Sequence, residues 1–338
     1  MLMLTQIIIL IVGFVLLIKG ADILIDGASG VARKFHVSPA LIGLTIVAFG
    51  TSAPELAVSI QAILSGSTDL TVGNVIGSGV LNILLLLGVA ALVRPIAIRK
   101  ETVKIELPLC ILITILFSVL MLDGLFSPGA ENIISRSDGA VLTVVFFIFL
   151  YYILCSAKRD KEKAARAQAK AEKALAHKRG RRKKPVEEKD KSMLWYLGLT
   201  AVGLAGVIFG SDFVVDSASA LAVTFGMSER FIALTIVAIG TSLPELVTTI
   251  TAARKGESGM LVGNIIGSNI FNICMVIGIP VLFAGAIPVG SFTIIDMVAF
   301  IIAPIMLFWF HLSGSHITRR EGLIMLGTFV AYYVTLFI

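Results

Sequence analysis

Two glutamates stand inside strongly apolar stretches of this 338-residue chain, each within the same short motif. Residues 43–56 read GLTIVAFGTSAPEL and residues 233–246 read ALTIVAIGTSLPEL, with eleven of fourteen positions identical. Each copy carries two hydroxyl groups and one carboxylate at the same spacing. These residues are Thr51, Ser52 and Glu55, and again Thr241, Ser242 and Glu245. Ionisable groups are costly near lipid and mark functional positions there, so the duplication predicts one site built from two halves.

A second block follows each motif at the same distance. Residues 73–82 read GNVIGSGVLN and residues 263–272 read GNIIGSNIFN, so the offset of 190 holds for both blocks. Amide and hydroxyl groups recur every four residues, which places them along one side of a helix. They are Asn74, Ser78 and Asn82, and Asn264, Ser268 and Asn272. The glycines beside them predict close helix approach. These are Gly73, Gly77, Gly263 and Gly267.

The first motif forms a polar stripe if it is helical. Its members lie at i, i+3, i+4 and i+7. They are Ala48, Thr51, Ser52 and Glu55 in one copy, and Ala238, Thr241, Ser242 and Glu245 in the other. Pro54 and Pro244 stand directly before the two glutamates, and a proline inside a helix frees the carbonyl four residues earlier, here at Gly50 and Gly240.

Every atom in this set that could bind a metal ion is an oxygen, and oxygen ligands suit hard cations such as Ca²⁺ or Na⁺. Neither apolar stretch holds a basic residue at the depth of Glu55 or Glu245 that could form a structural ion pair. The blocks of small residues alone are equally compatible with helix packing. The two unpaired carboxylates favour a site for mobile cations.

Composition places the chain in a membrane, because 57% of its residues are hydrophobic and only 15% are charged. Ten apolar segments are long enough to cross a hydrocarbon core of about 30 Å. They are 4–26, 37–63, 70–93, 103–122, 138–156, 193–215, 229–253, 258–284, 291–312 and 322–337. Helix-spaced small residues favour helices over a β-barrel. The expected fold is an all-α polytopic membrane protein with ten transmembrane helices.

Several functions are not expected. The apolar N-terminus lacks a basic region and a cleavage site, which argues against a removable signal peptide. The three cysteines and four histidines show no metal-ligand spacing, and no phosphate-binding loop for ATP is present. We therefore expect neither an enzyme nor a bound cofactor, and no nucleic-acid partner.

A basic segment, residues 157–192, divides the chain. It carries 15 Lys and Arg against 6 Asp and Glu, whereas the rest carries 13 against 16. Its composition predicts a solvated helix up to Gly180 and a disordered basic stretch beyond. Basic loops stay in the cytoplasm, so we expect this linker inside and both termini outside an inner membrane. A solvated loop is favoured over one that binds anionic lipids, which stays an alternative.

The linker separates a first five-helix repeat, residues 1–156, from a second, residues 193–338. Because five is odd, the copied motifs run in opposite directions through the bilayer, and the repeats are inverted. Inverted repeats place substrate sites at mid-membrane, where the halves meet. The offset also relates Gly20, Asp22 and Asp26 to Gly210, Asp212 and Asp216, and Glu106 to Asp296.

The two blocks, G-T-S-x-P-E-L and then G-N-x-I-G-S, each present twice, resemble the repeats of the cation/Ca²⁺ antiporter superfamily, especially prokaryotic sodium/calcium exchangers. The resemblance implies a monomer whose four central helices bind ions. Glu55 and Glu245 would be the main Ca²⁺ ligands, with the Thr51 and Thr241 carbonyls. The flanking Na⁺ sites would be lined by Ala48, Ser52, Ser78, Ala238, Ser242 and Ser268.

Asn82 and Asn272 depart from that family, in which one of these two positions often holds an aspartate. Two carboxylates balance one Ca²⁺, whereas several Na⁺ ions without a third acid are electrostatically harder to bind. The leading hypothesis is Na⁺/Ca²⁺ antiport by alternating access. Ca²⁺/H⁺ exchange and K⁺-dependent Na⁺/Ca²⁺ exchange are alternatives. A Ca²⁺-permeable channel or a membrane scaffold fits the inverted repeat and its carboxylates less well.

Overall fold

The chain is helical along most of its length. The computed structural model describes residues 2–64, 68–126, 131–177, 191–227, 238–289, 292–314 and 316–335. The α-helices of the first half are α1 (Leu2–Phe35), α2 (Pro39–Ile42), α3 (Ala48–Thr51), α4 (Ala53–Leu64), α5 (Thr68–Val80), α6 (Leu87–Val93), α7 (Leu107–Leu120), α8 (Asp123–Phe126) and α9 (Arg136–His177). Those of the second half are α10 (Met193–Thr224), α12 (Ala238–Thr241), α13 (Leu243–Lys255), α14 (Ser258–Phe271), α15 (Gly278–Ala284), α16 (Ile294–Ser313) and α17 (Arg319–Thr335).

Short π-helical stretches and two-residue strands complete the fold. The π-helical stretches are η1 (Gly43–Val47), η2 (Leu81–Leu86), η3 (Thr102–Glu106) and η5 (Asn272–Ile277), and the strands are β1 (Ile96–Ala97), β2 (Ile133–Ile134), β3 (Ile287–Pro288) and β4 (His316–Ile317). Among the described residues, three of these four π-helical stretches (η1, η2 and η5) lie within or beside the duplicated motif or the block that follows it. Wide turns of this kind are frequent at functional sites.

Seven helical stretches of the described residues are long and apolar enough to cross a membrane, and a bent pair makes an eighth. The other two predicted segments, 229–253 and 322–337, each extend past the described residues at one end. The count of ten therefore stays a prediction. The helix predicted for the start of the linker is present, since α9 runs on to His177. The basic stretch at 178–190 lies outside the described residues.

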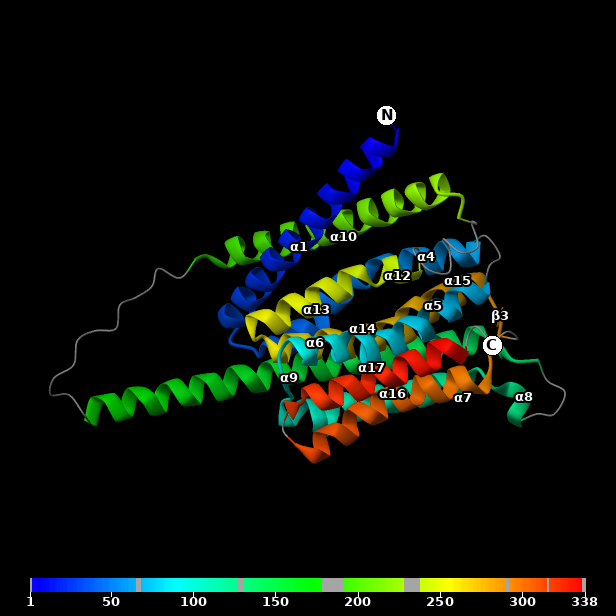
Figure 1. The fold of residues 1–338 in the computed structure, drawn as a ribbon. Helices are drawn as coiled ribbons and strands as arrows, with labels where there is room; N and C mark the ends of the chain where they lie inside the picture. The colour runs from blue at the N-terminus through cyan, green and yellow to red at the C-terminus, as the bar shows by residue number, and fades with distance from the viewer. Residues whose placement is uncertain are drawn as a thin grey trace.

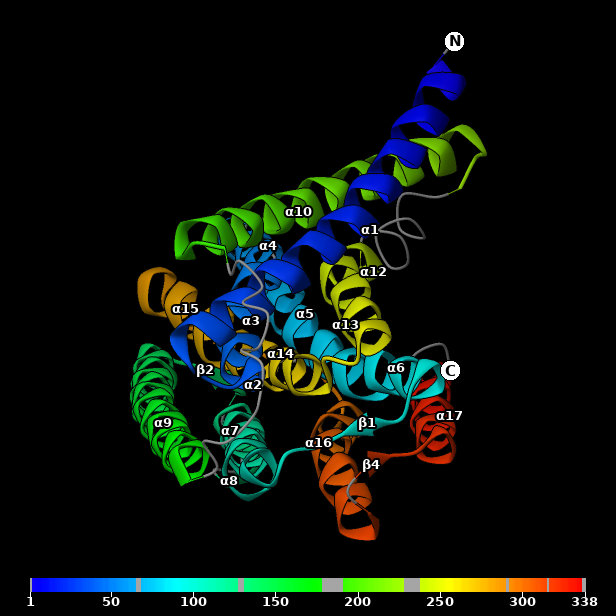
Figure 2. The same ribbon diagram turned by 90° about the vertical axis from the view of Figure 1, so that its left-hand side faces the viewer.

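The helices form two groups. Figure 1 shows α1 and α10 together above a block that contains the other long helices, and Figure 2 shows them crossing the face of that block. The end of the molecule at which α9 leaves the block, on the left of Figure 1, is called the linker side. Glycine also allows α1 and α10 to pack closely against each other, because a Cβ on Gly20 of α1 would lie 2.7 Å from the Val207 nitrogen of α10.

Two stretches are far more buried than the rest. Residues are buried over 78% of the apolar window of the α5–α6 stretch and 83% of that of α14–α15, against 22% for α10 and 28% for α1. These two stretches carry the blocks of Asn, Ser and Gly. Their polar side chains are therefore enclosed by protein, while α1 and α10 present mainly apolar side chains outward.

The two halves of the chain make reciprocal contacts. Strand β1, which follows α6, pairs with β4 in the second half, while β3, which follows α15, pairs with β2 in the first. The repeat-related acids Glu106 and Asp296 are both buried and both accept a hydrogen bond from a tyrosine, at 3.3 Å from Tyr152 and 2.9 Å from Tyr332. The tyrosine contacts of Glu106 and Asp296 are thus equivalent in the two halves.

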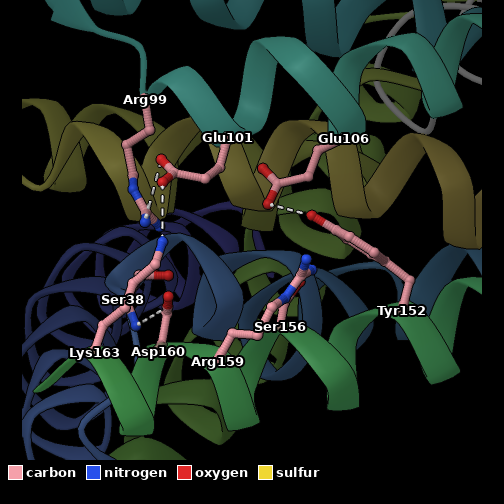
Figure 3. Close-up of polar contacts among 9 residues, drawn as sticks. All are labelled: Ser38, Arg99, Glu101, Glu106, Tyr152, Ser156, Arg159, Asp160 and Lys163. Carbon is pink, nitrogen blue, oxygen red and sulfur yellow. Dashed lines mark hydrogen bonds and ion pairs between the residues drawn. The ribbon is translucent and has the colours of Figure 1, made fainter. Parts of the chain in front are cut away.

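Polar contacts on the linker side hold the first duplicated segment in place. The Ser38 backbone N–H, just before α2, donates to the Asp160 carboxylate of α9 at 3.1 Å (Figure 3). Nearby, Glu101 forms ion pairs with Arg99 and Lys163 at 3.6 and 3.4 Å. A backbone hydrogen bond lowers the pKa of Glu101, and both basic groups lower it further.

A separate ion pair ties α1 to the second duplicated segment. The Lys255 ammonium, at the end of α13, lies 2.7 Å from a carboxylate oxygen of Asp26 and 3.7 Å from one of Asp22. It also donates to the Asp22 carbonyl at 2.7 Å. These contacts join the α1–α10 pair to the block on the linker side.

A side chain larger than hydrogen at Gly267 of α14 would clash with the first copy of the motif, residues 43–56. A Cβ there would lie 2.6 Å from the Leu44 carbonyl oxygen and 2.8 Å from the Ala48 Cβ. We expect Gly267→Ala to lower stability by about 1–3 kcal/mol, because rigid backbone must shift. Thermal unfolding of the purified protein in detergent measures this.

Gly198→Ala is the matched control, since a Cβ at Gly198 meets no atom of the described residues within 4 Å. We expect its melting temperature to equal or slightly exceed that of the parent, as alanine favours helix more than glycine. Equal melting temperatures for Gly267→Ala and the parent would show that the α14 crossing is not tightly packed.

Candidate cation-binding site

The first duplicated motif folds as two helices with a break at Ser52. Helix α3 ends at Thr51, α4 begins at Ala53, and the stretches on either side differ in direction by 42°. Ser52 has φ −86° and ψ 6°, outside helical values. Pro54 thus lies in the first turn of a new helix and not inside a continuous one, which corrects the sequence expectation. The missing N–H costs nothing there, because first-turn N–H groups have no helical partner.

The second motif breaks at the equivalent residue. Helix α12 ends at Thr241, Ser242 has φ −94° and ψ 5°, and Pro244 lies in the first turn of α13. The Gly240 carbonyl, expected to be freed by Pro244, accepts a hydrogen bond of 3.0 Å from the Ser211 hydroxyl of α10. This carbonyl therefore faces protein.

Glu55 and Glu245 come together from the two halves of the chain. Both follow the helix breaks, and each is only 1% exposed. The Ser52 hydroxyl of the first motif donates to Oε1 of Glu245 in the second at 3.1 Å. The two carboxyl groups also interact electrostatically with each other. The Glu245 carboxylate of the second motif thus reaches the first motif.

The Asn and Ser blocks of α5 and α14 meet in the same interior. Asn272 Nδ2 donates to the Ser78 hydroxyl at 3.2 Å, which joins the end of the second block to the middle of the first. The Thr51 hydroxyl lies 3.4 Å from Asn264 Oδ1, so the first motif also touches the second block. Asn74 Nδ2 lies 3.5 Å from the Glu55 carbonyl oxygen.

Several buried oxygens of this cluster accept or donate no hydrogen bond among the described residues. They are Oε1 and Oε2 of Glu55, Oε2 of Glu245, Oδ1 of Asn82, Oδ1 of Asn272 and Oγ of Ser268. Buried polar atoms are normally paired, so a concentration of unpaired oxygens at one place requires a ligand. Carboxylate, amide and hydroxyl oxygens together suit a hard cation.

Basic groups do not neutralise this cluster. The ion pairs formed by described residues involve Glu101, Asp22 and Asp26, and neither Glu55 nor Glu245 takes part in one. Across the same ranges no three His, Cys, Asp or Glu side chains gather as a resident metal centre would require. Two carboxylates with neutral oxygens provide a charge of −2, which one divalent cation balances.

The remaining predicted site residues lie as follows. Ala48, Thr51 and Ser52 are fully buried, and Ser78, Ser242 and Ser268 are buried within the same core. Thr241 is half-buried. The backbone of Ala238 begins α12, while its side chain lies outside the described residues. Direct contacts join Ser52 to Glu245 and Ser78 to Asn272, and the role of all these residues as ion ligands stays a prediction.

Asn269 is a polar residue of this core that the motif analysis missed. It is buried, its Oδ1 accepts from Asn82 Nδ2 at 3.2 Å, and its own Nδ2 lies 3.4 Å from the Gly79 carbonyl oxygen. Gly79 is the residue that the offset of 190 relates to Asn269. Asn269 could have been found as a position at which the two copies differ, whereas the site was predicted from positions at which they are identical.

The contact with Asn269 makes the two copies unequal. Asn272 donates to Ser78, but its counterpart Asn82 donates to Asn269, and the hydroxyl of Ser268 has no partner among the described residues. Asn82 is thus oriented by the second half of the chain. The symmetry of the sequence at Asn82 and Asn272 does not extend to their hydrogen bonds.

The chain belongs to the sodium/calcium exchanger protein family, whose model matches residues 5–155 and 195–338. It is 37% identical to the putative antiporter CaxA of Alkalimonas amylolytica, covering 99% of each chain. It is 30% identical to the sodium/calcium exchanger MaX1 of Methanosarcina acetivorans, covering 97% of each. The solved structure of the sodium-calcium exchanger NCX_Mj superimposes with a TM-score of 0.80, at 30% identity and 99% coverage of both chains.

These similarities confirm the resemblance read from the duplicated motifs. The chain is an integral membrane protein with the all-helical fold of these exchangers, and it is a cation/Ca²⁺ exchanger. The match omits residues 156–194, which contain the whole of the basic linker. The fold is thus shared with the family, while the linker is not covered by its model.

Asn269→Ala tests whether that residue holds Asn82 in place. The change removes an acceptor from Asn82 Nδ2 and a donor from the Gly79 carbonyl, which leaves buried polar groups unpaired. We expect it to lower stability by about 1–3 kcal/mol. Thermal unfolding in detergent is the measurement.

Ser217→Ala provides the control, because Ser217 is also buried and its hydroxyl has no partner among the described residues. Its removal leaves no group unpaired, and we expect little change. If the two variants melted alike, the hydrogen bonds of Asn269 would contribute nothing particular to the core.

Proposed function

We propose that this chain exchanges Na⁺ for Ca²⁺ across the membrane, extruding Ca²⁺ by alternating access. The observation that carries the proposal is the meeting of Glu55 and Glu245, both buried and without a basic partner among the described residues, beside unpaired amide and hydroxyl oxygens. The names of MaX1 and NCX_Mj as sodium/calcium exchangers support Na⁺ as the counter-ion.

Competition for the same carboxylates couples the two ions. A single Ca²⁺ or a set of Na⁺ ions balances the charge of Glu55 and Glu245, and both sets do not fit at once. Without either, two negative charges remain in an interior of low dielectric constant, which is unfavourable. The empty carrier therefore resists changing its access, while each loaded form can change, and this yields exchange without leak.

Individual roles follow from the placement of the oxygens. Glu55 and Glu245 are the main Ca²⁺ ligands, with the backbone carbonyls of Thr51 and Thr241 at the helix breaks. The flanking Na⁺ sites are lined by Ala48, Ser52, Ser78, Ala238, Ser242 and Ser268. Asn82 and Asn272 supply neutral oxygens where a third carboxylate would otherwise assist Na⁺.

We further propose ten transmembrane helices in two inverted five-helix repeats, residues 1–156 and 193–338. The reciprocal strand pairs and the equivalent tyrosine contacts of Glu106 and Asp296 support this arrangement. Charge asymmetry of the loops supports a cytoplasmic linker, residues 157–192, and termini outside an inner membrane. The exchanger functions as a monomer.

Glu55→Gln and Glu245→Gln test the proposed ligands directly. Each change keeps the side-chain shape but removes one of two charges that balance Ca²⁺. A loss of about 3 kcal/mol or more, typical of an unbalanced buried charge, predicts a decrease of over a hundredfold in uptake. The measurement is ⁴⁵Ca²⁺ uptake into Na⁺-loaded proteoliposomes containing purified protein.

Glu131→Gln, a change at an exposed glutamate outside the site, serves as the control and should leave uptake unchanged. Full uptake by either site variant would overturn the assignment of the carboxylates. Loss of uptake in the control would mean that the effect is not specific to the site.

The same vesicles decide which ion drives exchange. We expect an outward Na⁺ gradient to drive Ca²⁺ uptake at fixed pH and without K⁺. Uptake driven only by a pH gradient would replace the proposal with Ca²⁺/H⁺ exchange, and uptake that also requires K⁺ would make it K⁺-dependent. Ca²⁺ flux independent of every counter-ion gradient would indicate a channel.

A further inference from the structure

A cavity of about 580 Å³ opens on the linker side, apart from the carboxylate cluster. Three elements line it: the last turns of α1, the first turn of α10, and the turn between α13 and α14. It thus lies where the α1–α10 pair meets the helical block. None of the proposed cation ligands lines it.

One wall of the cavity carries a buried hydroxyl that lacks a partner. Ser29 of α1 is only 7% exposed and lines the cavity, and its Oγ makes no hydrogen bond with the described residues. Buried hydroxyl groups are normally satisfied. A polar ligand in the cavity would satisfy this one.

The opposite wall is the start of a long helix. Helix α10 begins at Met193 and runs for 32 residues, with Ser192 as its N-cap and no acidic residue in its first turn. Free N–H groups and the helix dipole make such an end favourable for an anion. The Ser192 hydroxyl accepts from the Trp195 N–H, and the neighbouring first-turn amides point the same way.

Two basic groups stand at the same cavity without an acidic partner among the described residues. The Arg33 guanidinium lies 5.7 Å from the centre of the Tyr196 ring, and the Lys191 ammonium lies 4.5 Å from that of Trp195. The third base, Lys255, is already paired with Asp26, so Glu257 is the one unpaired acid of the lining. Arg33 and Lys191 leave a net positive charge.

We propose that this cavity binds a phosphate group, supplied by a phospholipid of the leaflet on the linker side. Phosphate oxygens accept hydrogen bonds from the Ser29 hydroxyl, from Arg33 and from Lys191. Trp195 and Tyr196 are side chains typical of the headgroup level of a membrane, and Leu194 beside them is 80% exposed. The ligand is therefore held at the boundary between headgroups and acyl chains.

A single-tryptophan form of the full chain reports on the cavity. Trp195 and Trp309 are the two tryptophans, and Trp309→Phe changes an exposed side chain of α16 away from it. Trp195 emission is followed in detergent while short-chain phosphatidylglycerol, inorganic phosphate or an alkyl maltoside is added. We expect a saturable change with phosphatidylglycerol and none with the maltoside.

Substitutions in this background decide whether the cavity is responsible. We expect Arg33→Gln and Lys191→Gln each to weaken phosphatidylglycerol binding on the order of fivefold, as estimated for one basic group near an anionic surface. Ser29→Ala should weaken it as well. Arg320→Gln and Lys100→Gln remove exposed basic groups outside the cavity and should not alter the affinity.

Each outcome distinguishes the alternatives. Saturation by inorganic phosphate alone, with the same sensitivity to Arg33→Gln and Lys191→Gln, would retain the phosphate site and overturn the lipid as its source. Unchanged affinity in both variants, or equal weakening by the control substitutions, would overturn the site itself. These readouts do not involve Ca²⁺, so they stand apart from the proposed exchange function.

Discussion

The structure depends on keeping two carboxylates in a protein interior without basic partners. Glu55 and Glu245 are almost fully buried. The Ser52 hydroxyl donates to the Glu245 carboxylate, and neither carboxylate oxygen of Glu55 makes a hydrogen bond with the described residues. Removing a charge from water costs several kcal/mol even after relaxation, so two charged carboxylates here need compensation, which the proposed function assigns to the transported cation. An ion that compensates only while bound is well suited to being carried.

Local irregularities of the helices serve the same constraint. The breaks at Ser52 and Ser242 turn the glutamates toward the opposite motif, and prolines in the next turn fix where the new helices begin. π-helical stretches at η2 and η5 begin beside Asn82 and at Asn272. Close packing at Gly267 brings α14 against the first motif. Regular helices would carry the same residues but could not converge them so closely.

Much of this arrangement could be predicted from the sequence. Duplicated motifs with a constant offset predicted a shared site. Ser52 does contact Glu245, and Ser78 does contact Asn272, across the two halves, while ion binding there stays a prediction. The helix breaks were not foreseen, because a proline four residues after a glycine fits both a bent helix and a new one. Asn269 was missed because it differs between the copies. The hydrogen bonds that orient Asn82 depend on which helix lies opposite, and a single sequence does not contain that information.

The central claim, that Glu55 and Glu245 hold one Ca²⁺ between them, is tested most directly by diffraction from crystals grown with Ca²⁺. An anomalous difference map locates the ion without assumptions about transport. The account predicts one peak between the two carboxyl groups, with oxygens of both glutamates at about 2.3–2.6 Å. A peak coordinated by only one glutamate, or Ca²⁺ bound elsewhere with this interior vacant, would contradict it.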